Sequence, residues 1–393
     1  MSLLTIKKSK LSLIFICFFF FIPSANISVF YGLVAILCMA FLGKSAFKNK
    51  MVNYLIIFFL SWIVIGASYR AIFYESSYSI FAELIRVLFP CIIFLFIKKA
   101  GINTEKFITI LIVWCTFDVI VSALQFSHIR LGFIESIYYS ESSLTTLKLS
   151  NPRTLGFFSG VAEHGVFFML IFVWSYTQKF INGCRDKRLT VIFICSLISL
   201  FTSQSKTSLA GALVAVFIIT LFFGRIYARV LIATATTAVI ISLDFIFANF
   251  YQFKKLALMG LQSSSFVARE KKWGDFIEPL LNDPVLFVFG AGRAQLAQYG
   301  STFDSDYIFI FSVFGIIFLL GVYLFLGFLS VKYSTRRGEG KDLSLIAIFI
   351  AIIIAGGAVT PLLNPTSQML LVLFFRLFQA LLVLAEQPCL CLF

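Results

Sequence analysis

The sequence predicts an all-α polytopic membrane protein. Of the 393 residues, 60% are hydrophobic, only 13% are charged and 50 are phenylalanine, so a soluble fold would have too few polar residues to cover its surface. Apolar runs long enough to cross a bilayer recur from residue 11 almost to the C-terminus. We therefore expect residues 1–393 to form a single integral membrane domain, and these observations exclude a soluble enzyme fold and a disordered scaffold.

Segments of about 17 to 25 residues divide the chain into about twelve predicted transmembrane helices. They are expected near residues 11–25, 27–43, 51–69, 80–97, 107–126, 155–177, 189–205, 207–224, 230–248, 306–330, 343–361 and 367–385. The first run follows three lysines, as in a signal peptide. No small-residue cleavage site follows this run and a second begins at once, so we expect it to remain as the first crossing.

The basic residues predict the orientation of these helices. With the N-terminus inside, more than half of the 32 Lys and Arg residues fall in short connections on the inner face, as in Lys44–Lys50 and Lys332–Lys341. Both termini are then cytoplasmic. These clusters also account for the net charge of +14, so nucleic acid is not an expected partner. The eight cysteines and the scattered acids indicate no disulfide, metal site or cofactor.

Two longer segments interrupt the pattern of short connections. The first outer loop, residues 127–153, and the large outer loop, residues 249–305, both fall on the outer face and separate predicted helices. Long loops in a protein with otherwise minimal connections usually bind ligands or catalyse reactions. We therefore expect the function there, the alternative being a poorly ordered external insertion.

Charged residues at the outer ends of the helices are the first candidates for a site. Arg153 stands at the mouth of the sixth predicted helix, and Glu163 is expected two to three turns inside it. A carboxylate in a membrane needs a cationic partner or a watery cavity, so Glu163 is either functional or structurally paired. Lys206, in the hairpin 202–208, either reaches lipid headgroups or binds phosphate. Asp118, alone in its apolar run, is a weaker candidate for an interhelical pair.

The large outer loop and the residues just after it combine cations with aromatic side chains. Arg269 and Arg293 suit a diphosphate, because a guanidinium makes two parallel charge-assisted hydrogen bonds. The aromatic side chains expected to stack on sugar rings are Trp273, Tyr299 and Tyr307. Anionic lipid headgroups are an alternative ligand for the cations. We interpret Gly290–Gly292 as a turn that allows close backbone approach.

Two acids end the large outer loop, Asp304 and Asp306, just before the tenth predicted helix. An alcohol is a poor nucleophile unless a base accepts its proton as it attacks. Asp306 is the favoured base because it adjoins the start of the helix, whereas Asp304 lies further into the loop. Glu163 is the rival, and a solvated loop end is the alternative without a catalytic role.

The order of these features resembles the O-antigen ligase and polymerase superfamily of bacterial surface-polysaccharide assembly. Four local patterns match it: Arg153-x-x-Gly156 opening a helix, the hairpin Thr202-Ser203-Gln204-Ser205-Lys206, Arg269 before Trp273 and Gly290–Gly292, and Asp304-Ser305-Asp306-Tyr307 leading into Gly315. Lys206 departs from the arginine usual in the family. Ligases of the superfamily typically have a His-Asn pair near the last pattern, whereas the histidines of this chain, His128 and His164, lie elsewhere, which favours a polymerase.

This resemblance implies a helical bundle related to the GT-C-like membrane glycosyltransferases that use lipid-linked donors, working without metal or cofactor. Arg153, Arg269, Lys206 and Arg293 would bind the diphosphate of a polyprenyl-diphosphate-linked oligosaccharide, and a hydroxyl of a second lipid-linked repeat unit would attack the sugar. The enzyme would lie in the bacterial cytoplasmic (inner) membrane, with membrane lipid, a chain-length regulator and flippase proteins as partners. An O-antigen ligase and a flippase for lipid-linked oligosaccharides are the alternatives, although a flippase needs no long outer loop.

Overall fold

The computed structural model describes residues 50–73, 104–139, 141–148, 152–224, 264–292, 305–334 and 342–357, with further short stretches between residues 89 and 97, 226 and 242, and 359 and 374. Every regular element in these residues is a helix, which confirms the predicted all-α class. Among them, Glu105–Phe126 and Lys206–Phe223 are long and apolar enough to cross a membrane, and three shorter apolar helices accompany them. The number of crossings stays a prediction.

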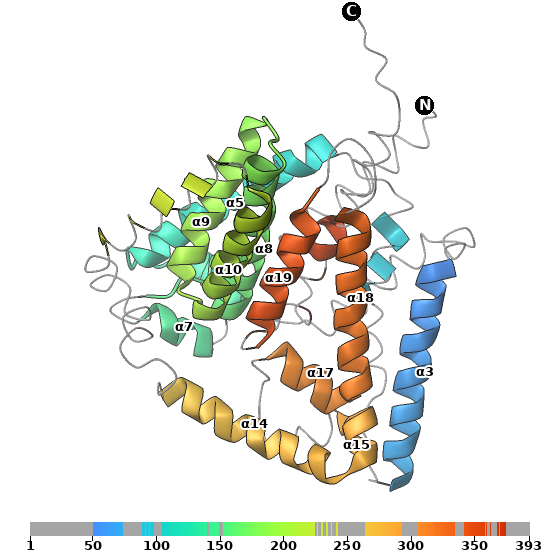
Figure 1. Ribbon diagram of the computed structural model, residues 1–393. Coiled ribbons are helices and arrows are strands. Elements are labelled where there is room, and N and C mark those ends of the chain that lie inside the picture. The colour runs from blue at the N-terminus through green and yellow to red at the C-terminus, as the bar shows by residue number, and fades with distance from the viewer. Residues whose placement is uncertain are drawn as a thin grey trace, which may run out of the picture.

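Four helices form one group, and one of them is surrounded by the others. They are α5 (Thr104–Phe126), α8 (Val161–Tyr176), α9 (Lys187–Ser203) and α10 (Lys206–Phe223), grouped together in Figure 1. Beyond its first turn α8 is almost entirely apolar, and its side chains from Phe167 to Ile171 are completely buried. A helix that is apolar on all sides is stable only when other helices surround it, so α8 is the centre of this group.

Polar contacts at the two ends of α8 fix the directions of its neighbours. Before α8 begins, the Thr154 amide donates to the Thr202 carbonyl near the end of α9, over 3.1 Å. Beyond the other end, the π-helical turn η3 (Thr177–Ile181) is followed by Asn182, whose amide donates to Asp342 just before α19 (Ser344–Gly356), over 2.7 Å. Helix α8 is therefore antiparallel to both, as expected if the sixth predicted crossing runs in one direction and the seventh and eleventh run in the other.

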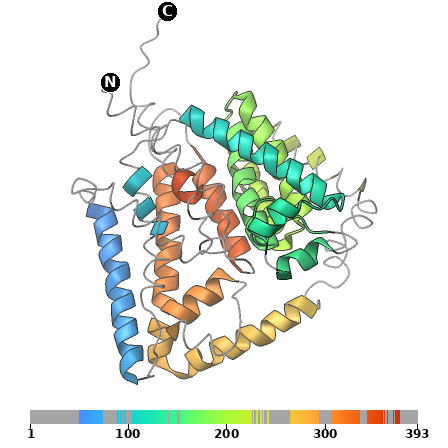
Figure 2. The same ribbon diagram turned by 180° about the vertical axis from the view of Figure 1, so that it is seen from behind.

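A second group contains helices from both ends of the chain. It comprises α3 (Lys50–Phe73), α15 (Pro284–Phe289), α17 (Asp306–Phe314) and α18 (Ile316–Ser334), with α19 between the two groups. Helix α14 (Ser264–Asn282) runs crosswise to α3 and α18, along one end of both groups, in both views (Figures 1 and 2). Part of the predicted large outer loop is thus helical.

The first predicted outer loop also contains two short helices, α6 (Gly132–Tyr138) and α7 (Glu141–Leu147). In both views α7 lies close to the N-terminal end of α14 (Figures 1 and 2). Described parts of the two long segments therefore lie at the same end of the helices, where the sequence predicted the function.

Three predicted helix boundaries were wrong. The helix expected at 155–177 begins only at Val161, because the residues before it hold a non-helical backbone with Gly156 at a φ of +55°. The helix expected at 306–330 is broken at Gly315, with a φ of +85°, and the one expected at 343–361 ends at Gly356. The helices expected at 11–25 and 27–43, and most of those at 80–97, 230–248 and 367–385, lie outside the described residues.

The break at Gly315 packs against the end of α15. A Cβ at Gly315 would overlap the Val288 carbonyl oxygen, and a Cβ at Gly290 would overlap the backbone of Val313. The Trp62 indole donates to the Phe314 carbonyl at the break, over 2.8 Å, so this end of α17 has a hydrogen-bond partner inside the protein. These contacts confirm that Gly290–Gly292 is a turn of close backbone approach.

We expect Gly290→Ala and Gly315→Ala each to destabilise the protein by on the order of 1–3 kcal/mol, because the added methyl group meets backbone that no side-chain rotation can move. Both residues also have a positive φ, which a side chain disfavours. The melting temperature of the purified protein in detergent measures the effect. Gly274→Ala is the matched control: a Cβ there meets no atom within 4 Å, so the melting temperature should stay equal or rise. Unchanged melting of both test variants would contradict the proposed backbone contact.

Candidate functional site

The segment before α8 is held in place by side chains rather than by helical hydrogen bonds. The Gln125 side-chain oxygen accepts from the amides of Leu155 and Gly156, over 2.8 and 3.1 Å. The Tyr139 hydroxyl donates to the Gly156 carbonyl. Because unpaired buried peptide groups are costly, these bonds allow the chain to stay non-helical at a buried position. Side chains from α5 and from the end of α6 therefore satisfy the backbone of this segment at Leu155 and Gly156.

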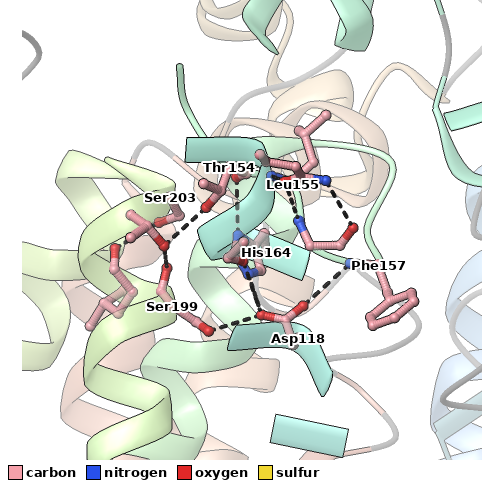
Figure 3. A network of polar contacts seen from close by, with 12 residues as sticks. Asp118, Thr154, Leu155, Phe157, His164, Ser199 and Ser203 are labelled. Atoms are coloured by element: carbon pink, nitrogen blue, oxygen red, sulfur yellow. Dashed lines mark hydrogen bonds and ion pairs between the residues drawn. The ribbon is translucent and has the colours of Figure 1, made fainter. Parts of the chain in front are cut away.

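A buried acid and a buried histidine complete this support, as Figure 3 shows. His164 Nε2 lies 2.9 Å from Asp118 Oδ2, and neither side chain is exposed. Ser199 also donates to this carboxylate oxygen, over 2.9 Å, while the Phe157 amide donates to the other, over 3.3 Å. The second ring nitrogen of the histidine lies 3.0 Å from the Thr154 carbonyl. Three helices thus contribute to one polar network around the segment.

Gly156 makes this arrangement possible. Its φ of +55° is unfavourable for other residues, and a Cβ there would overlap Oδ1 of Asp118 and crowd Nε2 of His164. The glycine of the pattern Arg153-x-x-Gly156 is therefore required by the close approach of backbone to the buried acid.

Arg153 joins this segment to the hairpin between α9 and α10. Its Nη2 donates to the Gln204 carbonyl, over 3.3 Å, and the Gln204 side chain donates to the Pro152 carbonyl, over 3.2 Å. Gln204 has a left-handed conformation, with a φ of 51°, which turns the chain directly into α10 at Lys206. Two of the four sequence patterns therefore meet in space, with partly exposed Lys206 two residues from the contact.

Arg269 of α14 comes close enough to Arg153 for the two positive charges to interact. Burial, together with the charge of Arg269, lowers the pKa of Arg153 to about 10, so the guanidinium still holds its proton at neutral pH. Among the residues that the structure describes, no carboxylate pairs with Arg153, and its buried Nε has no hydrogen-bond partner. Two cations whose charges interact, one of them with an unused donor, form a site suited to an anion.

The same face of α14 presents Trp273. Residues 269, 273, 276 and 280 recur at helical spacing, and Phe276 and Leu280 are buried while Lys271, Gly274 and Glu278 on the other face are exposed. Arg269 and Trp273, both partly exposed, therefore lie on the side of α14 that faces the other helices. An aromatic ring one turn from a cation suits a sugar next to a phosphate.

Of the two described acids predicted as bases, Glu163 is the more accessible. It lies in the first turn of α8, not two to three turns inside, because the helix starts late, and it is partly exposed. Ser159 donates to its carboxylate, over 2.6 Å, and Ser143 of α7 donates to the Ser159 carbonyl. Glu163 is thus at the end of α8 that borders α7.

Asp306 has a different environment. Its side chain is completely buried, and the Leu362 amide donates to Oδ2, over 2.7 Å. The preceding residue, Ser305, caps α17 and donates to the Gly356 carbonyl at the end of α19, over 2.9 Å. In this structure Asp306 therefore connects α17 to the chain beyond α19 and is closed to solvent.

The remaining predicted site residues are either packed between helices or outside the described residues. The Tyr307 hydroxyl donates to the Ile353 carbonyl, and its ring lies 5.0 Å from that of Tyr323, so it packs among α17, α18 and α19. Arg293, Tyr299 and Asp304 lie outside the described residues.

The sequence analysis named Asp118 as a candidate for an interhelical pair, which its contact with His164 confirms, but it identified neither His164 as the partner nor the support of the site by Gln125. One signal was present: Asp118 and Gln125 are seven residues apart in an apolar run and therefore share a helix face. The partners come from other helices, however, and the sequence does not say which helix lies opposite that face.

Neither a protein-family model nor a curated protein matches this chain.

Proposed function

We propose that the protein polymerises polyprenyl-diphosphate-linked oligosaccharide repeat units into O-antigen or capsule-like polysaccharide. The observation that supports this most is the approach of Arg153 to Arg269, from separate parts of an apolar chain. Repulsion between like charges at a partly buried site is unfavourable unless an anion compensates it. A diphosphate has enough oxygens to accept from both guanidinium groups.

We further propose about twelve crossings of the bacterial inner membrane, with the site on the outer face, both termini cytoplasmic and a bundle related to membrane glycosyltransferases that use lipid-linked donors. The antiparallel packing of α8 against α9 and α19 supports crossings in alternating directions. The basic residues Arg185, just before α9, and Lys187 and Arg188, in its first turn, lie at the opposite end of this helix from the hairpin that Arg153 contacts. Basic connections are typical of the cytoplasmic side.

In the proposed reaction, a hydroxyl of one lipid-linked repeat unit attacks the anomeric carbon of the other. The new glycosidic C–O bond forms as the bond between this carbon and the phosphate oxygen breaks, and polyprenyl diphosphate leaves with the electron pair. Arg153 and Arg269, with Lys206 and Arg293, stabilise the charge that develops on the leaving group. Trp273 stacks on a sugar ring. No metal or cofactor is assigned a role.

The proton of the attacking hydroxyl goes to a carboxylate, and we assign this role to Glu163. A general base must reach the hydroxyl directly or through one water molecule. Glu163 is partly exposed at the mouth of α8, whereas Asp306 is completely buried and already accepts from Leu362. Accessibility thus favours Glu163 over the acid preferred from the sequence.

Deleting the gene and separating the surface polysaccharide on a gel tests the proposed function. A polymerase defect should leave a product with a single repeat unit, which the intact gene on a plasmid restores to full length. Polymer that accumulates without transfer to its final acceptor would indicate a ligase instead. Loss of every external repeat unit would indicate a flippase, and either result would overturn the proposal.

The proposed topology is tested by thiol labelling. In a variant whose other cysteines are replaced, Lys271→Cys on the exposed face of α14 should react with an impermeant reagent in cells whose outer layer is permeabilised. A second variant that retains native Cys184 as its single cysteine is the matched control. Cys184 is exposed between η3 and α9 and should react only after the inner membrane is broken. The reverse pattern at the two sites would show that the orientation is inverted.

A further inference from the structure

The buried pair Asp118 and His164 has a position that packing alone does not explain. Asp118 lies within α5, one of the two helices in the described residues that are long and apolar enough to cross a membrane, and His164 in α8 is equally buried. Ionisable groups are expensive at such positions, and replacing a buried pair by apolar residues is often neutral or stabilising. A pair of this kind therefore calls for a role in addition to helix packing.

The hydrogen bonds determine the charge of the pair. His164 Nδ1 must carry a proton, because the Thr154 carbonyl can only accept. One further proton lies between Nε2 and Asp118 Oδ2, whichever atom holds it. The pair is thus neutral overall, and Ser199 and Ser122 donate further hydrogen bonds to the carboxylate. A neutral and fully bonded pair can be tolerated in an apolar interior.

The remaining bonds of the pair end on the backbone next to Arg153. His164 binds the Thr154 carbonyl and Asp118 binds the Phe157 amide. The Thr154 amide, on the other side of that residue, is bound to the Thr202 carbonyl. Both peptide groups of Thr154 are therefore fixed, and with them the Cα from which the Arg153 side chain extends toward Gln204.

We propose that Asp118 and His164 are positioning residues, which hold the backbone of residues 154–157 so that the Arg153 guanidinium stays at the hairpin, where it donates to the Gln204 carbonyl. The pair acts through Arg153 and does not touch the substrate. This inference deepens the proposed function and rests on it for the identity of the anion. It predicts how the backbone behaves even without a ligand.

Hydrogen–deuterium exchange of the purified full-length protein in detergent tests the positioning without a ligand. Asp118→Ala and His164→Ala should increase exchange at residues 154–157. Asp118→Asn should keep them protected, because its amide can donate to neutral His164 and to Ser199 while its oxygen accepts from Phe157. Asp342→Ala removes the contacts at the other end of α8 and should leave this segment unchanged. Wild-type protection in both alanine variants would overturn the proposal.

Binding of geranylgeranyl diphosphate, a soluble lipid diphosphate, tests the route through Arg153. Asp118→Ala should weaken binding by about tenfold or more, since a small displacement of a positioned group has effects of this size. In an Arg153→Ala background the same substitution should have little further effect, because the group it positions is gone. Equal losses in both backgrounds would show that the pair only stabilises the fold. If the wild-type protein binds no diphosphate, the proposed function fails, and the exchange experiment alone decides on the positioning.

Discussion

Replacing Glu163 with glutamine is expected to reduce polymerisation by about a hundredfold or more, the usual contribution of a general base. Glutamine keeps the size of the side chain and can still accept from Ser159, so folding should be preserved. It cannot accept the proton of the attacking hydroxyl. The measurement is turnover of purified lipid-linked repeat units by the reconstituted protein, at equal protein concentration.

Asp306→Asn is the comparison that distinguishes the two acids. Asparagine can accept from the Leu362 amide as Asp306 does, so most of the turnover should remain if this residue has only a structural role. An inactive but folded Asp306→Asn together with a near-normal Glu163→Gln would return the role of base to Asp306. It would also mean that α17 opens from α19 during the reaction, because Asp306 is completely buried in this structure.

Arg153→Lys and Arg269→Lys are expected to have the second largest effect. Lysine keeps the positive charge but loses the planar fork that donates two parallel hydrogen bonds. At about 1.5 to 3 kcal/mol per charge-assisted contact, turnover should fall roughly ten- to a hundredfold, with a shorter polymer on the cell surface. Lys271→Ala, on the exposed face of α14, is the control and should leave turnover unchanged. Full-length polymer from both lysine variants at normal protein level would contradict the assignment.

The Arg153→Lys variant should also acquire a dependence on pH that the wild-type protein lacks. Burial and the charge of Arg269 lower the pKa of Arg153 to about 10, so the wild-type cation persists well above neutral pH. Lysine starts from an ordinary pKa of about 10.4, and the same surroundings would lower it toward neutrality. A cation with a lowered pKa is lost as the pH rises, so diphosphate binding by the variant should weaken between about pH 7 and 9. Parallel pH profiles for the two proteins would show that the site does not destabilise the cation.

Composition and charge pattern predicted the helices better than the connections between them. The predicted helices at 51–69, 107–126, 189–205 and 207–224 correspond to α3, α5, α9 and α10 within a few residues. The ends of these apolar runs are marked by basic or polar residues. At Gly315 the apolar run continues through the break, and a glycine there does not reveal its φ. Hydrophobicity alone therefore predicted one helix where the structure has two.

In the candidate site, too, some features could be predicted from the sequence and others could not. The short patterns around Arg153 and the hairpin 202–206 were recognisable in the sequence, and the structure joins them through Gln204. The burial of Asp306 was not predictable, because the group that covers it, Leu362, comes from a distant part of the chain. Chemical roles that depend on one segment could thus be predicted from the sequence. Solvent exposure depends on several segments and could not be predicted.

The pairing of Asp118 with His164 has a consequence for how the protein is made. The two residues are 46 positions apart, so during synthesis α5 is complete before its partner leaves the ribosome. An acid at the centre of a membrane helix costs about 2.5 to 3.5 kcal/mol on insertion scales, and His164 of α8, which offsets this cost together with Ser199 of α9, arrives later. Under the proposed topology, we therefore expect α5 to be stably inserted in the bilayer only once α8 has docked against it. The separation of Asp118 from His164 in the sequence thus sets the order in which the two helices become stable in the membrane.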